Sequence, residues 1–185
     1  MGARRTRADV GTLANTNTPM PIYTNALVIG CGIAGATAAL RLAQDSQRQV
    51  MIITRAYDPE DSNTRYAQGG IVARGRDDSV DLLVEDILRA GAGLSLPEAA
   101  QQVAELGPVL VEDLLLLSLG VPFQRDAEGN LAYTREGGHS VSRILHVEDA
   151  TGHAIERSLI ARLQEMPNVT FRTGLTAVDL ITSSH

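Results

Sequence analysis

Apolar residues along the chain form short runs typical of buried strands, separated by stretches with helical spacing. An apolar run covers residues 26–29, a helical stretch covers 36–44, and a second apolar run covers 50–54. A strand, a helix and a strand in this order predict a parallel βαβ unit. We expect the first strand to be central and covered on both faces, with Ala38 and Leu42 of the helix facing the sheet.

The rest of the chain predicts more helices and further strands. Asp78 is expected to cap a helix over 79–90. Gly107-Pro108 is expected to break or bend the path between a helix over 97–106 and one over 109–119. A hairpin is expected over residues 123–134, with its loop at 126–130, and a helix that begins at Thr151 or Asp149 and ends at about residue 166. Strands are expected over 169–173 and 176–181. The predicted fold class is α/β, with a parallel sheet flanked by helices and a small hairpin.

The six residues after the first strand read G-C-G-I-A-G and match the pattern of a dinucleotide-binding turn. Gly30 permits a tight turn, Gly32 lets the backbone approach a pyrophosphate, and Gly35 lets the helix pack closely on the strand. The first helical N–H groups, around Ile33 and Ala34, carry partial positive charge and can bind a diphosphate. A purely structural strand, turn and helix is the alternative.

The second strand runs into Arg55, which narrows the choice of dinucleotide. A site for NAD usually has an acidic residue here that binds the ribose hydroxyls. A basic residue instead leaves two alternatives, an NADP site or a flavin-binding family with a different ribose contact.

Composition restricts the class of protein. With 44% hydrophobic and 21% charged residues, the 185-residue chain is expected to be soluble and globular. The formal net charge of −6 argues against a nucleic-acid surface, and no apolar stretch reaches the ~20 residues that span a bilayer. The single cysteine, Cys31, permits no intrachain disulfide and indicates a reducing compartment, the cytoplasm.

The chain is expected to contain one domain preceded by a leader. Residues 1–24 are polar, lack periodicity and predict a disordered leader, with a transit peptide as the alternative. Residues 25–185 form the domain. No metal site is expected, because Gly137, Gly138 and Gly152 argue against a continuous helix that would align the histidines spaced by sevens: His139, His146 and His153.

Three separated segments together resemble one family. They are the glycine turn, S-N-T-R-Y-A-Q-G-G at 62–70, and T-R-E-G-G-H-S at 134–140 followed by R-I-L-H at 143–146. The chain from about 25 to 181 is similar to the L-aspartate oxidases, within the succinate dehydrogenase and fumarate reductase flavoprotein family. This resemblance implies a Rossmann-like FAD-binding domain and oxidation of L-aspartate to iminoaspartate, with electrons passed to oxygen or fumarate.

The resemblance also implies a pathway and a set of cofactor contacts. The reaction belongs to quinolinate and NAD biosynthesis, with possible hand-over of iminoaspartate to quinolinate synthase. The turn would hold the FAD diphosphate, residues 63–70 would wrap the ribityl and isoalloxazine, and residues 176–177 would lie near the adenine. The implied cofactor-binding residues are Gly30, Cys31, Gly32, Ile33, Ala34, Gly35, Arg55, Asn63, Thr64, Arg65, Tyr66, Ala67, Gln68, Gly69, Gly70, Thr176 and Ala177.

Two residues define the expected chemistry. Glu136 matches the acidic residue that orients the substrate amino group, which a carboxylate can hold by a charge-assisted hydrogen bond. Asn63 stands where covalent members have a histidine joined to the flavin, so the FAD is expected to be noncovalent.

Family members also carry a capping domain that this chain is expected to lack. It would therefore be an N-terminal fragment with doubtful activity of its own. The alternatives are a soluble fumarate reductase or succinate dehydrogenase-like flavoprotein, an NADP-dependent dehydrogenase that uses Arg55, and a non-catalytic nucleotide-binding fragment.

Overall fold

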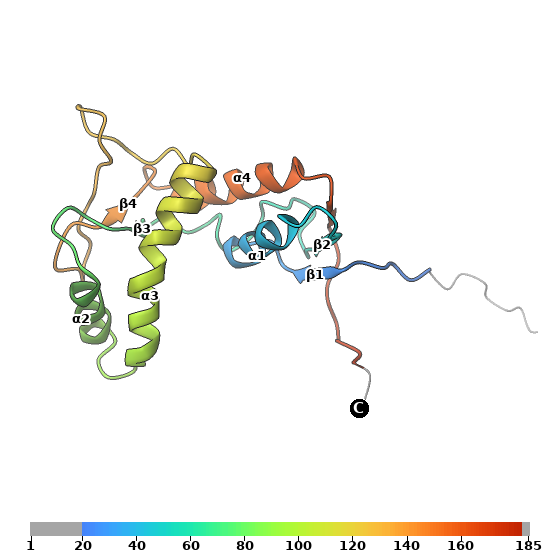
Figure 1. The fold of residues 1–185 in the computed structure, drawn as a ribbon, viewed down its shortest axis with the longest axis horizontal. Helices are drawn as coiled ribbons and strands as arrows, with labels where there is room; N and C mark the ends of the chain where they lie inside the picture. The colour runs from blue at the N-terminus through green and yellow to red at the C-terminus, as the bar shows by residue number, and fades with distance from the viewer. Residues whose placement is uncertain (1–19, 183–185) are drawn as a thin grey trace, which may run out of the picture.

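The computed structural model describes residues 20–182 (Figure 1). Most of the predicted leader at residues 1–24 therefore lies outside the described residues. The elements, in chain order, are β1 (Ala26–Ile29), α1 (Ile33–Ala43), β2 (Val50–Ile53), β3 (Ile71–Val72), α2 (Val80–Ala90), α3 (Pro97–Leu110), η1 (Val111–Ser118), β4 (Ile144–Leu145), α4 (Thr151–Gln164) and β5 (Val169–Arg172).

The structure contains the predicted parallel sheet, whose strands lie in the order β1-β2-β5. Val50 and Ile52 of β2 are buried beneath α1, and α4 packs on α1 (Figure 1). Ile155, Leu159, Ile160 and Leu163 of α4 are all in the core, as their helical spacing indicates. The helices α2 and α3 lie together beside this unit, next to the antiparallel pair β3-β4 (Figure 1).

The predicted central position of β1 is wrong within the described residues, where β1 pairs with β2 alone and forms an edge. Val28 faces α1: a Cβ added to Gly35, a residue of α1, would lie 3.3 Å from Val28 Cγ1. Leu27 and Ile29 point to the opposite face and are 48% and 51% exposed. The described helices therefore cover one face of β1 and leave the other open.

The helix after the glycine turn begins earlier than expected. The first residue of α1 is Ile33, and its buried residues are Ala36, Ala39, Leu40 and Ala43. Ala38 is exposed, so its predicted place against the sheet is wrong. At 100° per residue, Ala38 lies on the far side of a helix that buries Ala36 and Ala39.

Gly107-Pro108 does not break the helix. Residues 97–118 are continuously helical, with α3 passing into the wider turns of η1. Pro108 has no N–H to offer to the Ala104 carbonyl one turn earlier, and Arg74 Nη2 donates to that oxygen at 2.8 Å instead. A distant side chain thus satisfies the carbonyl group that the proline leaves free.

Three local predictions also differ from the structure. Ser79, not Asp78, caps α2, by accepting from the Leu82 N–H at 3.1 Å. The expected hairpin at 123–134 is reduced to one isolated bridge, Arg125 to Leu131, because Asp126 side-chain hydrogen bonds hold its loop. The expected strand at 176–181 is irregular backbone with no strand partner in the described part of the chain.

Candidate cofactor site

The glycine turn joins β1 to α1 at the carboxyl end of the parallel strands. Gly30 has φ +92°, a left-handed conformation that glycine adopts without strain, and its N–H donates to the Ile53 carbonyl at 2.8 Å. A Cβ on Gly35 would overlap the Gly30 carbonyl oxygen, so α1 packs directly on the turn. The backbone therefore presents the N-terminus of α1 at the sheet edge where dinucleotides bind.

The 62–70 segment folds back over this turn. Thr64 Oγ1 accepts from the Ile33 N–H at 2.9 Å and would lie 3.1 Å from a Cβ on Gly32. The Thr64 N–H in turn donates to Ser62 Oγ at 3.1 Å. The Ile33 N–H, expected to be free for a phosphate, is therefore bound to a hydroxyl whose own hydrogen remains to be donated.

A cavity of about 650 Å³ lies between the turn, the end of β2 and this segment. Nine of the seventeen predicted cofactor residues line it: Gly30, Cys31, Gly32, Arg55, Asn63, Thr64, Tyr66, Thr176 and Ala177. Segments more than a hundred residues apart in sequence thus meet at one cavity.

The other predicted cofactor residues lie outside this cavity. Ile33, Ala34 and Gly35 belong to α1, and Arg65 pairs with Asp58 at 3.2 Å. Gln68 and Gly69 are exposed, and Gly70 packs against Ile144 and Leu145 of β4. Ala67 accepts a hydrogen bond from the Gly152 N–H at 2.9 Å, which attaches the segment to the start of α4.

Sequence reasoning missed several residues of the site. The cavity is also lined by Ile29, Ile53, Thr54, Ala56, Asp61, Ser62 and Leu175. Tyr66 donates to Asp61 at 2.7 Å, and that hydrogen bond raises the pKa of the Tyr66 phenol. Ser62 is the first residue of the 62–70 motif and directly precedes Asn63, where the predicted cofactor-binding segment begins. Its position in the motif could have identified it as a residue of the site.

Glu136 lies beyond the cavity, on an exposed loop next to the 62–70 segment. Its Oε2 would be 3.9 Å from a Cβ on Gly69. The structure therefore places Glu136 beside Gly69, one of the residues expected near the isoalloxazine. Neither Glu136 nor Gly69 lines the cavity.

Buried ion pairs fix the loop that carries Glu136. Arg143 is fully buried and donates to both oxygens of Asp78, at 3.1 and 2.8 Å, and to Asp86 at 2.6 Å. The Ser140 N–H and hydroxyl also donate to Asp86, at 2.7 and 2.9 Å. Burial alone would raise the pKa of Asp86, but the bonds from Ser140 and Arg143 outweigh it and lower that pKa to about 2.

Cys31 has no geometry for nucleophilic chemistry. Its side chain is 2% exposed and donates to the Pro59 carbonyl at 2.8 Å. Burial, which disfavours the thiolate, raises the pKa of the thiol. We assign Cys31 to packing of the turn.

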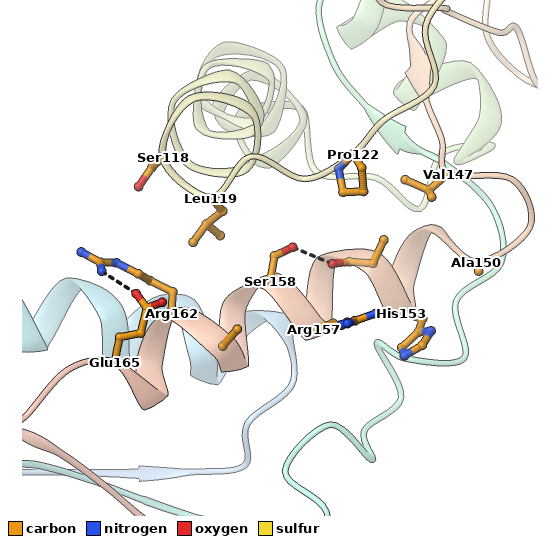
Figure 2. Close-up of a pocket in the computed structure, with 12 residues that line it drawn as sticks. Ser118, Leu119, Pro122, Val147, Ala150, His153, Arg157, Ser158, Arg162 and Glu165 are labelled. Carbon is orange, nitrogen blue, oxygen red and sulfur yellow. Dashed lines mark hydrogen bonds and ion pairs between the residues drawn. The ribbon is translucent and has the colours of Figure 1, made fainter.

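Another cavity, of about 670 Å³, lies on the opposite face of α4 from α1. Figure 2 shows Leu119 and Pro122 on one side of it and His153, Ser158 and Arg162 of α4 on the other. None of the predicted site residues lines it. Over residues 20–182, no three His, Cys, Asp or Glu side chains are placed to hold a metal ion, and no helix is long and apolar enough to cross a bilayer.

The cradle fits a dinucleotide such as FAD on structural grounds. A Cβ at Gly32 would reduce the space above the N-terminus of α1, where a diphosphate is favoured. Hydroxyls of Ser62 and Thr64 and the guanidinium of Arg55 line the same cavity and can bind phosphate or ribose oxygens.

Comparison with known proteins agrees with this geometry. The FAD binding domain family matches residues 25–185. The L-aspartate oxidase of Halobacterium salinarum is 45% identical over 159 residues, which is 86% of this chain and 30% of that protein. L-aspartate oxidase 1 of Ralstonia nicotianae is 42% identical over 160 residues, 85% of this chain and 29% of that protein.

A solved structure extends the comparison to the fold. The E. coli quinol fumarate reductase FrdA aligns with a TM-score of 0.74 and 26% identity, over 80% of this chain and 25% of that one. The chain thus spans about 30% of the length of the curated relatives it matches. The chain belongs to the FAD binding domain family, in the branch of L-aspartate oxidases and the succinate dehydrogenase and fumarate reductase flavoproteins.

Proposed function

We propose that this chain is the FAD-binding part of a flavoenzyme that oxidises L-aspartate to iminoaspartate. The observation that carries the proposal is the cavity at the N-terminus of α1, where three predicted cofactor segments meet, in a chain 45% identical to an L-aspartate oxidase over its matched residues. The match to an FAD family favours FAD over the NADP alternative for Arg55.

The residues of this chain have distinct roles in the proposal. The turn and the hydroxyls of Ser62 and Thr64 hold the diphosphate, and Thr176 and Ala177 lie at the adenine end. Glu136, fixed through the buried Arg143 pairs, orients the substrate ammonium. FAD held by these residues would supply the two-electron acceptor chemistry, with oxygen or fumarate as the final electron acceptor.

The product and setting follow from the same proposal. Iminoaspartate would be handed to quinolinate synthase in pyridine nucleotide biosynthesis, in the cytoplasm. A fumarate reductase-like activity on dicarboxylates is the second candidate, favoured by the structural similarity to FrdA.

The FAD is expected to be noncovalent, because the Asn63 amide cannot form the bond that a histidine makes to the flavin. The purified chain, incubated with FAD and freed of excess, should be yellow, and acid precipitation should release the flavin into the supernatant. Yellow colour that stays in the pellet would contradict the noncovalent mode. A chain that acquires no colour would contradict the cofactor assignment itself.

Replacing Glu136 with glutamine in a full-length version of the enzyme is expected to impair L-aspartate oxidation more than fumarate reduction. A charged hydrogen bond to the ammonium is roughly twice as strong as a neutral one, and fumarate has no ammonium. We expect kcat/KM to fall by about tenfold or more for L-aspartate and by much less for fumarate, which corresponds to ~1.4 kcal/mol of selective transition-state stabilisation. Equal losses for both substrates would instead favour the second candidate, an undifferentiated dicarboxylate flavoenzyme.

A further inference from the structure

One acidic side chain, Glu156, lies on the buried face of α4, near two residues that line the proposed cofactor cavity, Cys31 and Ser62. Glu156 is 0% exposed, and neither carboxylate oxygen has a hydrogen-bond partner of normal geometry in the described chain. Buried polar groups are almost always paired, and an unpaired carboxylate is far more costly to bury as an anion than as a neutral acid. The arrangement therefore favours the protonated form.

The groups around Glu156 offer no compensating cation. The turn contributes the buried thiol of Cys31, and the loop after β2 contributes the Ser62 hydroxyl and the Glu60 carboxylate.

Two basic groups near this region belong to other pairs. His153, on the same helix, lies 3.7 Å from Glu60, and Arg65 pairs with Asp58. Burial raises the pKa of Glu156 to about 7; the Ser62 hydroxyl partly opposes this effect, and Glu60 adds to it.

Glu156 is coupled to the cavity through two of its lining residues. Cys31 and Ser62 both line the cavity and both interact with Glu156. Ser62 Oγ accepts from the Thr64 N–H, and Thr64 Oγ1 accepts from the Ile33 N–H at the start of α1. An anionic Glu156 would thus place a negative charge behind the segment that receives the FAD diphosphate.

We propose that Glu156 is a buried acid near the FAD site that acts through Cys31 and Ser62 and must be protonated for FAD to bind. The proposal rests on the FAD site proposed above. A neutral Glu156 adds no negative charge behind the diphosphate, and a chain with ionised Glu156 takes up one proton from solvent as FAD binds. FAD affinity is therefore linked to pH through a group that does not touch the cofactor.

The test is a titration of the 185-residue chain with FAD at several pH values between 6 and 9, followed by flavin fluorescence and calorimetry. If the chain with ionised Glu156 does not bind FAD at all, the Kd for FAD rises by about tenfold per pH unit above the pKa of Glu156. The rise between pH 6 and 9 is then on the order of 100-fold. Glu156→Gln, a neutral side chain of the same shape, should bind FAD with a nearly constant Kd.

Two further variants identify the source of the pH dependence. Glu165→Gln changes an exposed carboxylate on the segment after α4 and should keep the wild-type slope. His153→Gln tests the histidine beside Glu60 and should also keep it. The proposal would be overturned if the Kd for FAD changed equally with pH in the wild type and in Glu156→Gln, or if the wild-type Kd did not change with pH.

A second measurement does not depend on any variant. Binding enthalpies at pH 8 in buffers of different ionisation enthalpy report the protons taken up, and we expect close to one for the wild-type chain. Zero uptake would overturn the proposal even where Glu156→Gln fails to fold. Absence of FAD binding at pH 6 would instead count against the proposed FAD site as a whole.

Discussion

Replacing Arg143 with alanine is expected to lower the free energy of unfolding by about 3–5 kcal/mol, because it removes the one fully buried cation that Asp78 and Asp86 share. Only the more exposed Arg74, 3.9 Å from Asp78, and Arg89, paired with Asp86, would remain. Arg143 and Asp78 are both fully buried, and the side chain of Asp86 is 3% exposed. Neither Asp78 nor Asp86 can recover hydration without opening the contact between α2 and the 134–143 loop. Urea unfolding at pH 7 measures the loss.

A matched control is Arg162→Ala, which removes an exposed pair with Glu165 at 2.9 Å. Exposed pairs contribute about 0–1 kcal/mol, so this variant should unfold close to the wild type. Similar small losses in both variants would mean that water reaches Asp78 and Asp86.

The pH dependence of stability gives an independent check on the same ion pairs. The pKa of Asp86 is about 2 in the folded chain, below its ordinary value of 3.8. The folded state therefore binds fewer protons than the unfolded state between these values, and the stabilisation is lost as the pH falls from about 4 to about 2. Arg143→Ala should raise this pKa and reduce the acid-dependent loss.

Replacing Gly152 with alanine is expected to weaken FAD binding by on the order of 100-fold, although alanine normally favours a helix over glycine. A Cβ at this position would overlap the Thr64 carbonyl oxygen and lie 2.7 Å from that of Ala67. Backbone carbonyls cannot rotate away, so the 64–67 segment must move as a unit. Thr64 would then leave the Ile33 N–H, and the cavity would lose its wall.

The measurement is the Kd for FAD from quenching of flavin fluorescence, with circular dichroism to confirm retained helix content. Gly107→Ala is the control, since its Cβ would meet only Val103 Cγ1, at 4.0 Å. That variant should bind FAD like the wild type. Unchanged affinity in Gly152→Ala would show that the segment tolerates displacement and does not form the site.

Features set by neighbouring residues could be predicted from the sequence. The residues of β1 and the core side of α4 follow from apolar periodicity, and the turn follows from the order of a strand, Gly30 and a helix. The position of Glu156 also left a signal that was missed. It lies four residues from both Gly152 and Ile160, on the same face of the helix, where a charge is unexpected.

Features set by distant contacts could not be predicted in this way. The helix passes through Pro108, and Arg74, which lies 30 residues before Ala104, donates a hydrogen bond to the Ala104 carbonyl that the proline leaves free. The Ile33 N–H is bound by Thr64, and Asp78 pairs with Arg143 instead of capping α2. Each of these hydrogen bonds and ion pairs joins residues that are distant in sequence and meet only in the folded chain. The local sequence preferences of helices, caps and turns therefore could not predict them.

The parallel pairing of β5 with β2 has a consequence for how the chain folds. Val50 meets Val169 across more than a hundred residues, and a buried amide of Asn168 ties the same end to the carbonyls of Ala43, Asp45 and Arg48. Closing so long a loop is entropically costly, and contacts of high sequence separation slow folding. During synthesis on the ribosome, β1, α1 and β2 emerge long before β5, so the edge of β2 that pairs with β5 keeps unpaired backbone N–H and C=O groups until residues near 172 leave the tunnel. This interval is when the nascent chain is most exposed to aggregation and has most need of a chaperone.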